Sequence, residues 1–212
     1  ENAAYGTSCY PFCASKIGSI GSSYEGTELR IADSGEIQVH GPCLMQGYYL
    51  EPEKTAAAFT ADGFLKTGDR GEMDAQGQVR ITGRLKEIFK TAKGKYVAPA
   101  PIEAKFMANP TIEQVCVTGN KLPQPIALVV LSEAAQQRQA EQVRKELEDQ
   151  LRAINAGLER HQQLDRILIC SDPWTTDNEL LTPTLKVRRH QLEKRLADQI
   201  STRYDDQVVR LA

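Results

Sequence analysis

The sequence has no long hydrophobic run and no marked excess of charge of either sign. No apolar stretch approaches the roughly 18 residues that a membrane-spanning helix needs, so we expect no transmembrane segment and leave peripheral membrane contact open. The 26 Lys and Arg residues are balanced by 28 Asp and Glu residues, giving a net charge of -2. This balance argues against nucleic acid bound by bulk charge, so we expect no nucleic-acid partner and small molecules instead.

Cysteine is scarce and follows no metal-binding or disulfide pattern. The five cysteines are scattered, and the three histidines lie far from them in sequence. Cys9 and Cys13 could pair or bind a metal, but small buried thiols are the simpler interpretation. A chain without a zinc spacing or a disulfide framework fits a reducing compartment, so we expect a cytoplasmic protein.

What remains is the composition of a globular protein. The 212 residues are 41% hydrophobic and 25% charged, which allows one or two hydrophobic cores. The chain has no internal repeats. It begins at Glu1 rather than at methionine, from which we expect a fragment.

The most informative stretch runs from residue 67 to residue 99. It opens with Thr67-Gly68-Asp69, which follows the apolar pair Phe64-Leu65, so we expect Asp69 to lie at a strand end with free backbone around it. Such a carboxylate can accept hydrogen bonds from both hydroxyls of a vicinal diol such as a ribose. Taken alone, a Thr-Gly-Asp sequence is more often an ordinary polar hairpin tip.

A hairpin pattern comes next. Residues 74–77 have turn composition, and Val79 and Ile81 alternate with polar neighbours as in a half-buried strand. Gly83 permits backbone angles that other residues avoid, and Arg84 offers a planar fork of five donors to phosphate or ribose oxygens. We expect Lys86 to begin another β-like run.

The remainder predicts an α+β fold, in which a small β-rich part is followed by alternating strands and helices. One helix carries Val143, Leu147, Leu151, Ile154 and Leu158 as a single apolar stripe on a charged cylinder. The other expected elements are a hairpin over 27–41, a helix over 52–59, a hairpin over 86–97, a helix from Pro99 to Asn109, strands at 112–118, 126–131 and 167–170, and a final amphipathic helix with Val187, Leu192, Leu196 and Ile200.

The order and spacing of the pieces resemble the adenylate-forming superfamily of acyl-CoA synthetases, luciferases and peptide-synthetase adenylation domains. The resemblance covers nearly the whole chain, and its last motif has the form found in long-chain acyl-CoA synthetases. The matching pieces are Gly18-Ser19-Ile20-Gly21, Gly26-Thr27-Glu28-Leu29-Arg30-Ile31, Gly35-Glu36-Ile37-Gln38-Val39, Gly47-Tyr48-Tyr49, Asp62-Gly63-Phe64-Leu65-Lys66-Thr67-Gly68-Asp69, Gly83-Arg84-Leu85-Lys86 and Leu181-Thr182-Pro183-Thr184-Leu185-Lys186-Val187.

The resemblance implies two domains and a two-step reaction. Residues 1–83 would be the C-terminal part of the AMP-binding N-terminal domain, and residues 84–212 the small, mobile α/β C-terminal domain with a short sheet flanked by helices. The family joins a carboxylic acid to ATP, releases pyrophosphate, and passes the acyl group to coenzyme A. Its phosphate loop and acyl pocket would lie in a missing N-terminal part of the same chain, so the fragment alone would be an inactive piece of a long- or medium-chain fatty acid–CoA ligase.

The resemblance also implies roles for particular residues in nucleotide binding and catalysis. Asp69 would hold the ribose hydroxyls, Arg84 would contact ribose or phosphate, and Lys186 would reach α-phosphate and carboxylate oxygens. A fixed cation is useful there because charge builds on the α-phosphate. The basic run 186–190 could instead form a phosphate or nucleic-acid patch, but Glu193 and Asp198 dilute its charge.

Three further assignments concern motion, the thiol and a metal. Lys86 would be the hinge, and Lys93-Gly94-Lys95 would line the tunnel that delivers the thiol. Glu1 would be the end of a Tyr-Gly-x-Thr-Glu motif that helps to hold Mg²⁺. A rival alignment places Tyr5-Gly6-Thr7-Ser8 there, with Cys9 in place of the glutamate.

Two other classes of function remain open. One is a peptide-synthetase or aryl-acid adenylation enzyme, which would show a downstream carrier-protein domain or no affinity for coenzyme A. The other is a binding or scaffolding module of the same fold without chemistry. An upstream phosphate loop in the gene would exclude this module.

Overall fold

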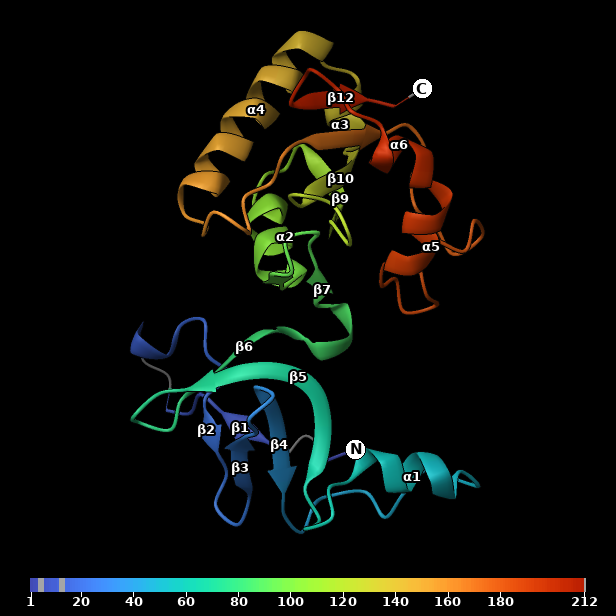
Figure 1. Cartoon of the computed structure of the whole chain (residues 1–212). Coiled ribbons are helices and arrows are strands. Elements are labelled where there is room, and N and C mark those ends of the chain that lie inside the picture. Colours follow the sequence, from blue (N-terminus) through green and yellow to red (C-terminus); the bar gives the residue numbers. More distant parts are fainter. Residues whose placement is uncertain (4–5, 12–13, 212) are drawn as a thin grey trace. The chain divides into compact units, whose positions relative to one another are not determined.

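The computed structural model describes residues 1–3, 6–11 and 14–211, and the chain divides into two compact units, Glu1–Glu87 and Ile88–Ala212 (Figure 1). The division falls a few residues beyond residue 83, where the sequence suggests a domain boundary. Both units combine strands and helices, as the α+β prediction requires.

The first unit is built on an antiparallel sheet of four strands in the order β3-β4-β5-β6. A small cluster of Ile37, Val39 and Val79 is buried against it, with Leu29 and Ile31 partly covered. The pairs β3–β4 and β5–β6 confirm the two hairpins predicted for this part of the chain, and α1 confirms the helix that begins at Pro52. The elements of this unit are β1 (Thr7–Ser8), η1 (Ala14–Lys16), β2 (Ser22–Ser23), β3 (Glu28–Ile31), β4 (Glu36–His40), α1 (Pro52–Ala58), β5 (Leu65–Met73), β6 (Val79–Arg84) and η2 (Leu85–Glu87).

Strand β5 does not end at Asp69, so the expectation of a strand end there is wrong. The strand continues to Met73, and Asp69 is paired with Arg84 of β6. Gly68 has a φ of 71°, a left-handed value that suits glycine, and the β5–β6 register shifts just after Arg70. These irregularities accompany the pronounced curve of β5 in Figure 1, and the strand bends rather than stopping.

Two further local predictions are wrong. Lys86 does not begin a strand, because Leu85–Glu87 forms the 3-10 turn η2 and the next strand starts only at Phe89. Val79 is fully buried as expected, but Ile81 is 44% exposed, so the predicted burial of both apolar residues of β6 holds only for Val79.

The second unit contains a four-stranded sheet in the order β12-β11-β10-β9. The β9–β10 pair is antiparallel, whereas β10, β11 and β12 run parallel. The expected strands at 112–118, 126–131 and 167–170 are confirmed. The elements are β7 (Phe89–Lys90), β8 (Tyr96–Val97), α2 (Pro99–Met107), β9 (Ile112–Thr118), β10 (Ile126–Leu131), α3 (Glu133–Gln136), α4 (Ala140–Ala156), β11 (Ile167–Cys170), α5 (Arg189–Arg195), α6 (Ala197–Ser201) and β12 (Val208–Arg210).

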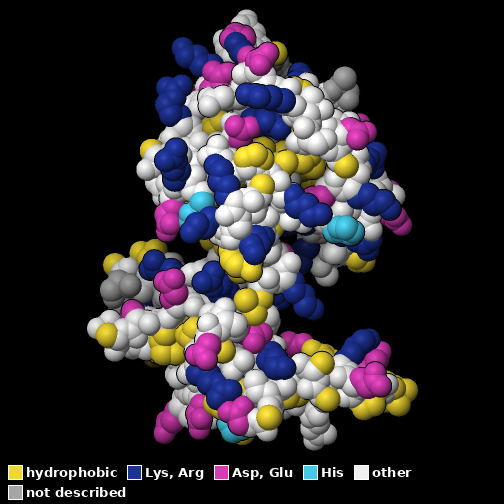
Figure 2. All heavy atoms as spheres, viewed as in Figure 1, with side chains coloured by type: hydrophobic (Ala, Val, Ile, Leu, Met, Phe, Trp, Pro, Cys, Tyr) yellow, Lys and Arg dark blue, Asp and Glu magenta, His cyan; other side chains and the backbone are white. Residues whose placement is uncertain are grey.

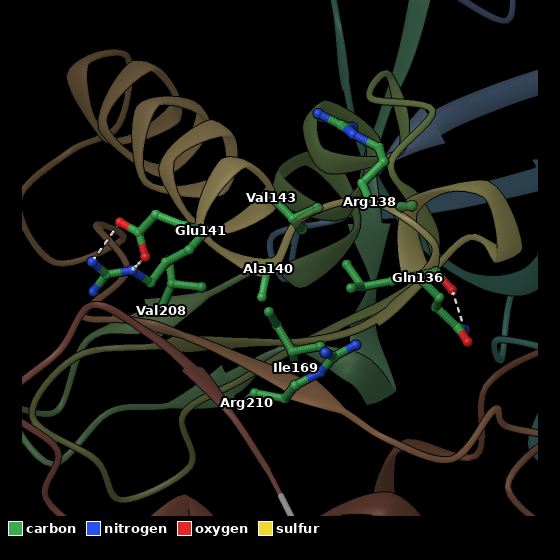
Figure 3. A pocket seen from close by; sticks show the side chains of 11 residues that line it. Gln136, Arg138, Ala140, Glu141, Val143, Ile169, Val208 and Arg210 are labelled. Carbon is green, nitrogen blue, oxygen red and sulfur yellow. Dashed lines mark hydrogen bonds and ion pairs between the residues drawn. The ribbon is translucent and has the colours of Figure 1, made fainter.

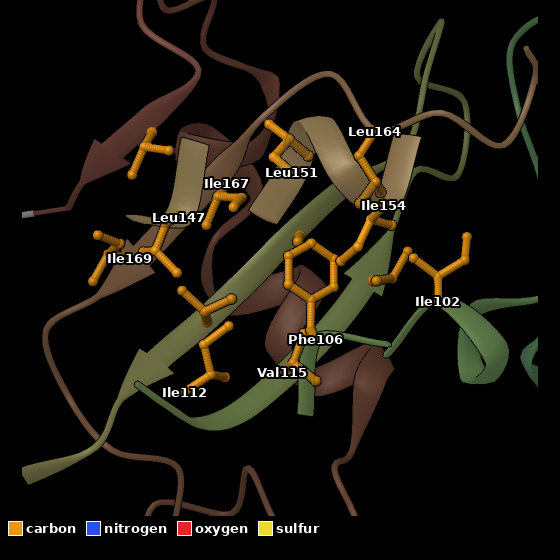
Figure 4. Close-up of a cluster of buried hydrophobic side chains, with 14 of the residues drawn as sticks. Ile102, Phe106, Ile112, Val115, Leu147, Leu151, Ile154, Leu164, Ile167 and Ile169 are labelled. Atoms are coloured by element: carbon orange, nitrogen blue, oxygen red, sulfur yellow. The ribbon is translucent and has the colours of Figure 1, made fainter. Parts of the chain in front are cut away.

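Helices cover both faces of this sheet, so β10 is buried along its whole length. Its residues alternate between two cores: Val129 packs with the α2 and α4 side chains, and Leu128 packs with those of α5. Figure 4 shows the first core, where Phe106 of α2 lies among the stripe residues of α4. The stripe prediction is confirmed for the four residues within α4, and Leu158 lies just beyond the helix, partly covered.

The predicted single terminal helix is two short helices. The helix is interrupted at Leu196, which has φ -105° and ψ 21°, and a second helix, α6, follows. The apolar stripe survives the break because Leu192, Leu196 and Ile200 all pack into the second core. Strand β12 has no counterpart among the sequence predictions, because three residues are too few to show a periodicity.

Candidate functional site

Asp69 and Arg84 form an ion pair across β5 and β6. Arg84 Nε lies 2.9 Å from Asp69 Oδ1, and both side chains remain partly exposed. The pair therefore presents an oriented carboxylate and a guanidinium at one place on the first unit, which suits hydroxyl and phosphate oxygens.

The backbone that carries Asp69 is fixed by a buried carboxylate that sequence reasoning missed. Glu36 is 8% exposed, and its Oε1 accepts a hydrogen bond from the Gly68 N–H at 3.0 Å. Thr67 Oγ1 donates to the Ile37 carbonyl at 2.7 Å and accepts from the Asp69 N–H at 3.1 Å. The sequence offers only a weak signal for this support, a glutamate placed between the turn glycine Gly35 and the apolar Ile37 in a predicted strand.

In the second unit, Lys186 is exposed near the base of a tight loop whose tip is formed by residues 183–185. Leu181 and Val187 close the loop by an isolated β-bridge, and the Thr182 N–H donates to the Lys186 carbonyl at 2.8 Å. The Lys186 N–H donates to Thr182 Oγ1 at 3.0 Å, and Leu185 adopts a φ of 59°. Because Leu181 is buried, the loop has a fixed base and presents the ammonium to solvent.

Lys93, Gly94 and Lys95 form the turn of the β7–β8 hairpin. The Thr91 N–H donates to the Lys95 carbonyl at 2.9 Å, and the Gly94 N–H donates to the Thr91 carbonyl at 2.9 Å. Gly94 has a φ of 77°, which a larger residue adopts only with strain. The hairpin tip is thus narrow, basic and exposed.

The hinge candidate Lys86 and the metal candidate Glu1 both belong to the first unit. Lys86 is exposed in η2, directly before the division between the units. The Glu1 carboxylate accepts a hydrogen bond from the Tyr48 hydroxyl, which raises the pKa of Tyr48. Over the described ranges there is no group of three metal-ligating side chains, so Glu1 has no neighbours that complete a Mg²⁺ site with it. Tyr5 of the rival alignment lies outside the described residues.

The structure separates the cysteines into two kinds. Cys116 and Cys170 are buried, and burial raises the pKa of Cys116 to about 12 and that of Cys170 to about 11. Cys9 is only half-buried, with Sγ 3.5 Å from the Ser19 carbonyl, so its interpretation as a buried thiol is wrong. Cys13 lies outside the described residues.

A cavity of about 130 Å³ lies between α4 and the sheet of the second unit (Figure 3). Its lining includes the apolar residues Val143, Ile169 and Val208 and three arginines, Arg138, Arg144 and Arg210. Arg144 is ion-paired with Glu141 at 2.9 Å. The candidate site residues, all of which are described, are absent from its lining, so the cavity is separate from them.

Basic side chains are not gathered on the face seen in Figure 2, where Lys and Arg are interspersed with Asp and Glu over both units. Within the run 186–190, Arg189 turns inward and its side chain is 16% exposed. Among the described helices, each is too short or too polar to cross a bilayer.

Comparison with solved structures identifies the class of protein. The chain is similar in structure to adenylation domains of adenylate-forming enzymes. One is the adenylation and carrier-protein didomain of carboxylic acid reductase from Segniliparus rugosus in complex with AMP, with a TM-score of 0.69 and 27% identity over 82% of this chain and 27% of that chain. The family model described as the AMP-binding enzyme C-terminal domain matches residues 86–208. The chain belongs to this family.

Curated relatives carry the likeness across both units. The long-chain-fatty-acid–CoA ligase FadD15 of Mycobacterium tuberculosis is 35% identical over 207 residues, covering 90% of this chain and 34% of the relative. Long-chain-fatty-acid–CoA ligase 1 of Homo sapiens is 36% identical over 188 residues, covering 80% and 27% respectively. The chain spans about a third or less of the length of these relatives.

Proposed function

We propose that this chain is the C-terminal part of an ATP-dependent acyl-CoA synthetase that acts on long- or medium-chain fatty acids in the cytoplasm. The proposal is carried by one observation above all, the hydrogen-bonded loop that exposes Lys186 beside the bridge of Leu181 and Val187. The identity to long-chain ligases over most of the chain supports the substrate class. Residues 1–83 belong to the nucleotide-binding domain, and residues 84–212 form the small C-terminal domain.

In the first half-reaction, a fatty acid carboxylate attacks the α-phosphorus of ATP and pyrophosphate leaves. Asp69 accepts hydrogen bonds from the ribose hydroxyls, and Arg84 holds Asp69 and reaches towards ribose or phosphate oxygens. Lys186 stabilises the negative charge that builds on the α-phosphate and the carboxylate.

In the second half-reaction, the thiol of coenzyme A attacks the acyl-adenylate carbonyl and AMP leaves. The small domain turns about Lys86, because a charged side chain in water loses no core contact when its backbone angles change. Lys186 then leaves the site, and the hairpin with Lys93, Gly94 and Lys95 lines the path of the thiol. The missing N-terminal part supplies the phosphate loop and the acyl pocket.

The direct test incubates the complete protein with ATP, a long-chain fatty acid and coenzyme A. We expect AMP and acyl-CoA to form in equal amounts, and the 212-residue chain alone to form neither acyl-adenylate nor acyl-CoA. Adenylate formation by the isolated chain contradicts the proposal that the triphosphate and acyl sites lie outside it.

A second candidate function is an adenylation enzyme that loads a carrier protein with an aryl or amino acid. The likeness to the carboxylic acid reductase didomain favours testing it. An enzyme of this kind acylates a phosphopantetheinylated carrier protein and leaves coenzyme A unmodified. If the complete protein forms the adenylate but transfers the acyl group neither to coenzyme A nor to a carrier protein, and does not bind coenzyme A, both candidate functions are rejected.

A further inference from the structure

An ion pair that is largely covered, though not fully buried, joins the start of α5 to α2. Arg189 lies three residues after Lys186 in the sequence. Its Nη2 lies 2.8 Å from Glu103 Oε1, and both side chains are less than a fifth exposed. The Arg189 Nη1 donates to Cys116 Sγ at 2.9 Å and to the Val117 carbonyl at 2.5 Å. A guanidinium can serve these three acceptors at once because its donors form a rigid planar fork, which lysine lacks.

The ion pair wraps around the edge of the sheet. Strand β9 is an edge strand, so the outward-facing backbone groups of Val117 find no partner strand on that side. Glu103 Oε1 accepts from the Val117 N–H at 2.7 Å, while Arg189 donates to the Val117 carbonyl. The pair thereby connects α2 and α5, which cover opposite faces of the sheet, through one residue of β9.

A second contact fixes α5 to the same strand end. Thr118 Oγ1 donates to a carboxylate oxygen of Glu193. Glu193 lies four residues after Arg189, so the two side chains point from one face of the helix. Helix α5, which begins two residues after Val187 of the loop, is consequently held to the end of β9 at two neighbouring points.

The end of β9 leads directly to the β7–β8 hairpin. The Lys121 N–H donates to the Lys90 carbonyl at 3.1 Å, and the Ala92 N–H donates to the Leu122 carbonyl at 2.8 Å. Both contacts lie at the hairpin whose tip is formed by Lys93, Gly94 and Lys95 (β7 in Figure 1).

Gly119 makes the approach of the hairpin close. A Cβ at this position would lie 2.7 Å from Pro125 Cα and 2.9 Å from Phe89 Cε2, closer than real Cβ atoms come. The turn that follows Thr118 therefore packs directly on the hairpin. Contacts run without interruption from the Lys186 loop through Arg189 and β9 to this turn.

We propose that Arg189 and Glu103 are positioning residues that tie the Lys186 loop (residues 182–187) and the β7–β8 hairpin (residues 89–97) into one rigid body. Stability alone does not explain the pair, because well-packed apolar residues in place of a buried ion pair are often as stable. The Lys186 loop serves the first half-reaction and the β7–β8 hairpin serves the second. A rigid connection would keep the distance between them fixed while the small domain turns. The functional part of this inference rests on the proposed function.

Amide hydrogen exchange on the chain tests the connection without any activity assay. In Arg189→Met we expect exchange to rise at least about tenfold at Thr182 and Leu185 and, together with them, at Ala92 and Gly94, because breaking a buried ion pair releases the parts it holds. Arg188→Met is the matched control, since this neighbouring side chain is exposed. An increase confined to the Lys186 loop overturns the proposal, as does an equal increase at Leu128 in the sheet centre.

The single variant leaves Glu103 buried without its cation and risks general unfolding. The double variant Arg189→Met with Glu103→Gln removes both charges and keeps an acceptor for the Val117 N–H. We expect it to unfold within a few degrees of the wild-type temperature and still to show faster exchange in both the loop and the hairpin. Wild-type exchange rates in this folded double variant overturn the proposal.

Half-reaction kinetics on the complete ligase test the consequence for catalysis. We expect Arg189→Lys to lower kcat of adenylate formation and of thioester formation by similar factors of about ten, since small displacements of catalytic groups are costly, with KM for ATP almost unchanged. Arg188→Lys should leave both rates unchanged. If the exchange data show the connection but both half-reactions keep wild-type rates, the positioning role is wrong. A failure of the proposed function would appear separately, as absence of acyl-adenylate in the wild type.

Discussion

Asp69 and Arg84 are direct partners across strands β5 and β6, and their side chains meet at 2.9 Å. The pair is partly exposed, so by itself it adds little to stability. Its main consequence is orientation, because the arginine restricts the rotamers of the carboxylate.

This orientation predicts a specific dependence on the ribose 2′-hydroxyl. In the complete protein, Asp69→Ala should raise KM for ATP by about ten- to a hundredfold, since a hydrogen bond to a charged group contributes about 1.5–3 kcal/mol. The variant should also lose the preference for ATP over 2′-deoxy-ATP. Steady-state kinetics with both nucleotides measure this, and Glu72→Ala on the same strand is the control because its side chain is exposed. A retained preference for ATP in Asp69→Ala contradicts the assignment.

The cysteines should divide into two classes by reactivity. Since burial raises the pKa of Cys116 and Cys170 to about 12 and about 11, both remain protonated thiols at pH 8.5. Iodoacetamide at this pH should modify Cys9 and Cys43 in the native protein and leave the buried pair intact. Peptide mass spectrometry measures the extent, and a sample denatured in guanidinium is the control in which all should react. Alkylation of native Cys116 as fast as Cys43 counts against the second core as described.

The turn η2 should be the first point of proteolytic attack. Lys86 is exposed there, and the two compact units meet in sequence at Glu87 and Ile88. Brief trypsin treatment should therefore cut after Arg84 or Lys86 and release two persistent fragments, which mass spectrometry identifies. In Lys86→Gln the cut should move to Arg84. Earliest cuts between residues 100 and 170 would show that the boundary lies elsewhere.

The sequence predicted most elements of the second unit because their signals are local. Strand β10 is a dense apolar run, β9 is rich in β-branched residues, and the four buried residues of α4 recur at helical spacing. The sequence does not indicate the break at Leu196, which leaves the apolar spacing of 192, 196 and 200 intact. It does not indicate β12 either, because this strand exists by pairing with β11. Likewise β5 continues through Asp69 because it pairs with β6. The local sequence, with Gly68 before Asp69, indicates a strand end instead.

The candidate site was predictable only where a motif names its residues. Lys186 and the residues 93–95 lie in tight exposed turns, which their glycine, proline and threonine content suggests. Supporting contacts were invisible, because Glu36 reaches Gly68 and Arg189 reaches Glu103 only in the folded chain. Neither residue stands out locally, since Glu36 follows a turn glycine and Arg189 lies in a basic run.

The hairpin tip should matter for the thiol step and not for the adenylate step. Gly94 has a φ of 77° and carries no side chain, so Gly94→Leu should strain the turn and crowd the path of coenzyme A. We expect slower thioester formation from supplied acyl-adenylate with nearly normal adenylate formation. Gly77→Leu, in the turn between β5 and β6 with a φ of 74°, is the matched control for backbone strain alone.

The most direct test of the two-step account is the measurement of both half-reactions in Lys186→Ala of the complete protein. Adenylate formation should fall about a hundredfold, since a lost contact to transition-state charge costs on the order of 3 kcal/mol. Thioester formation from supplied acyl-adenylate should stay within about twofold of wild type, and Lys194→Ala, an exposed lysine of α5, should change neither rate. Equal losses in both half-reactions would contradict the account and leave Lys186 as a solvated lysine whose removal only disturbs the end of the chain.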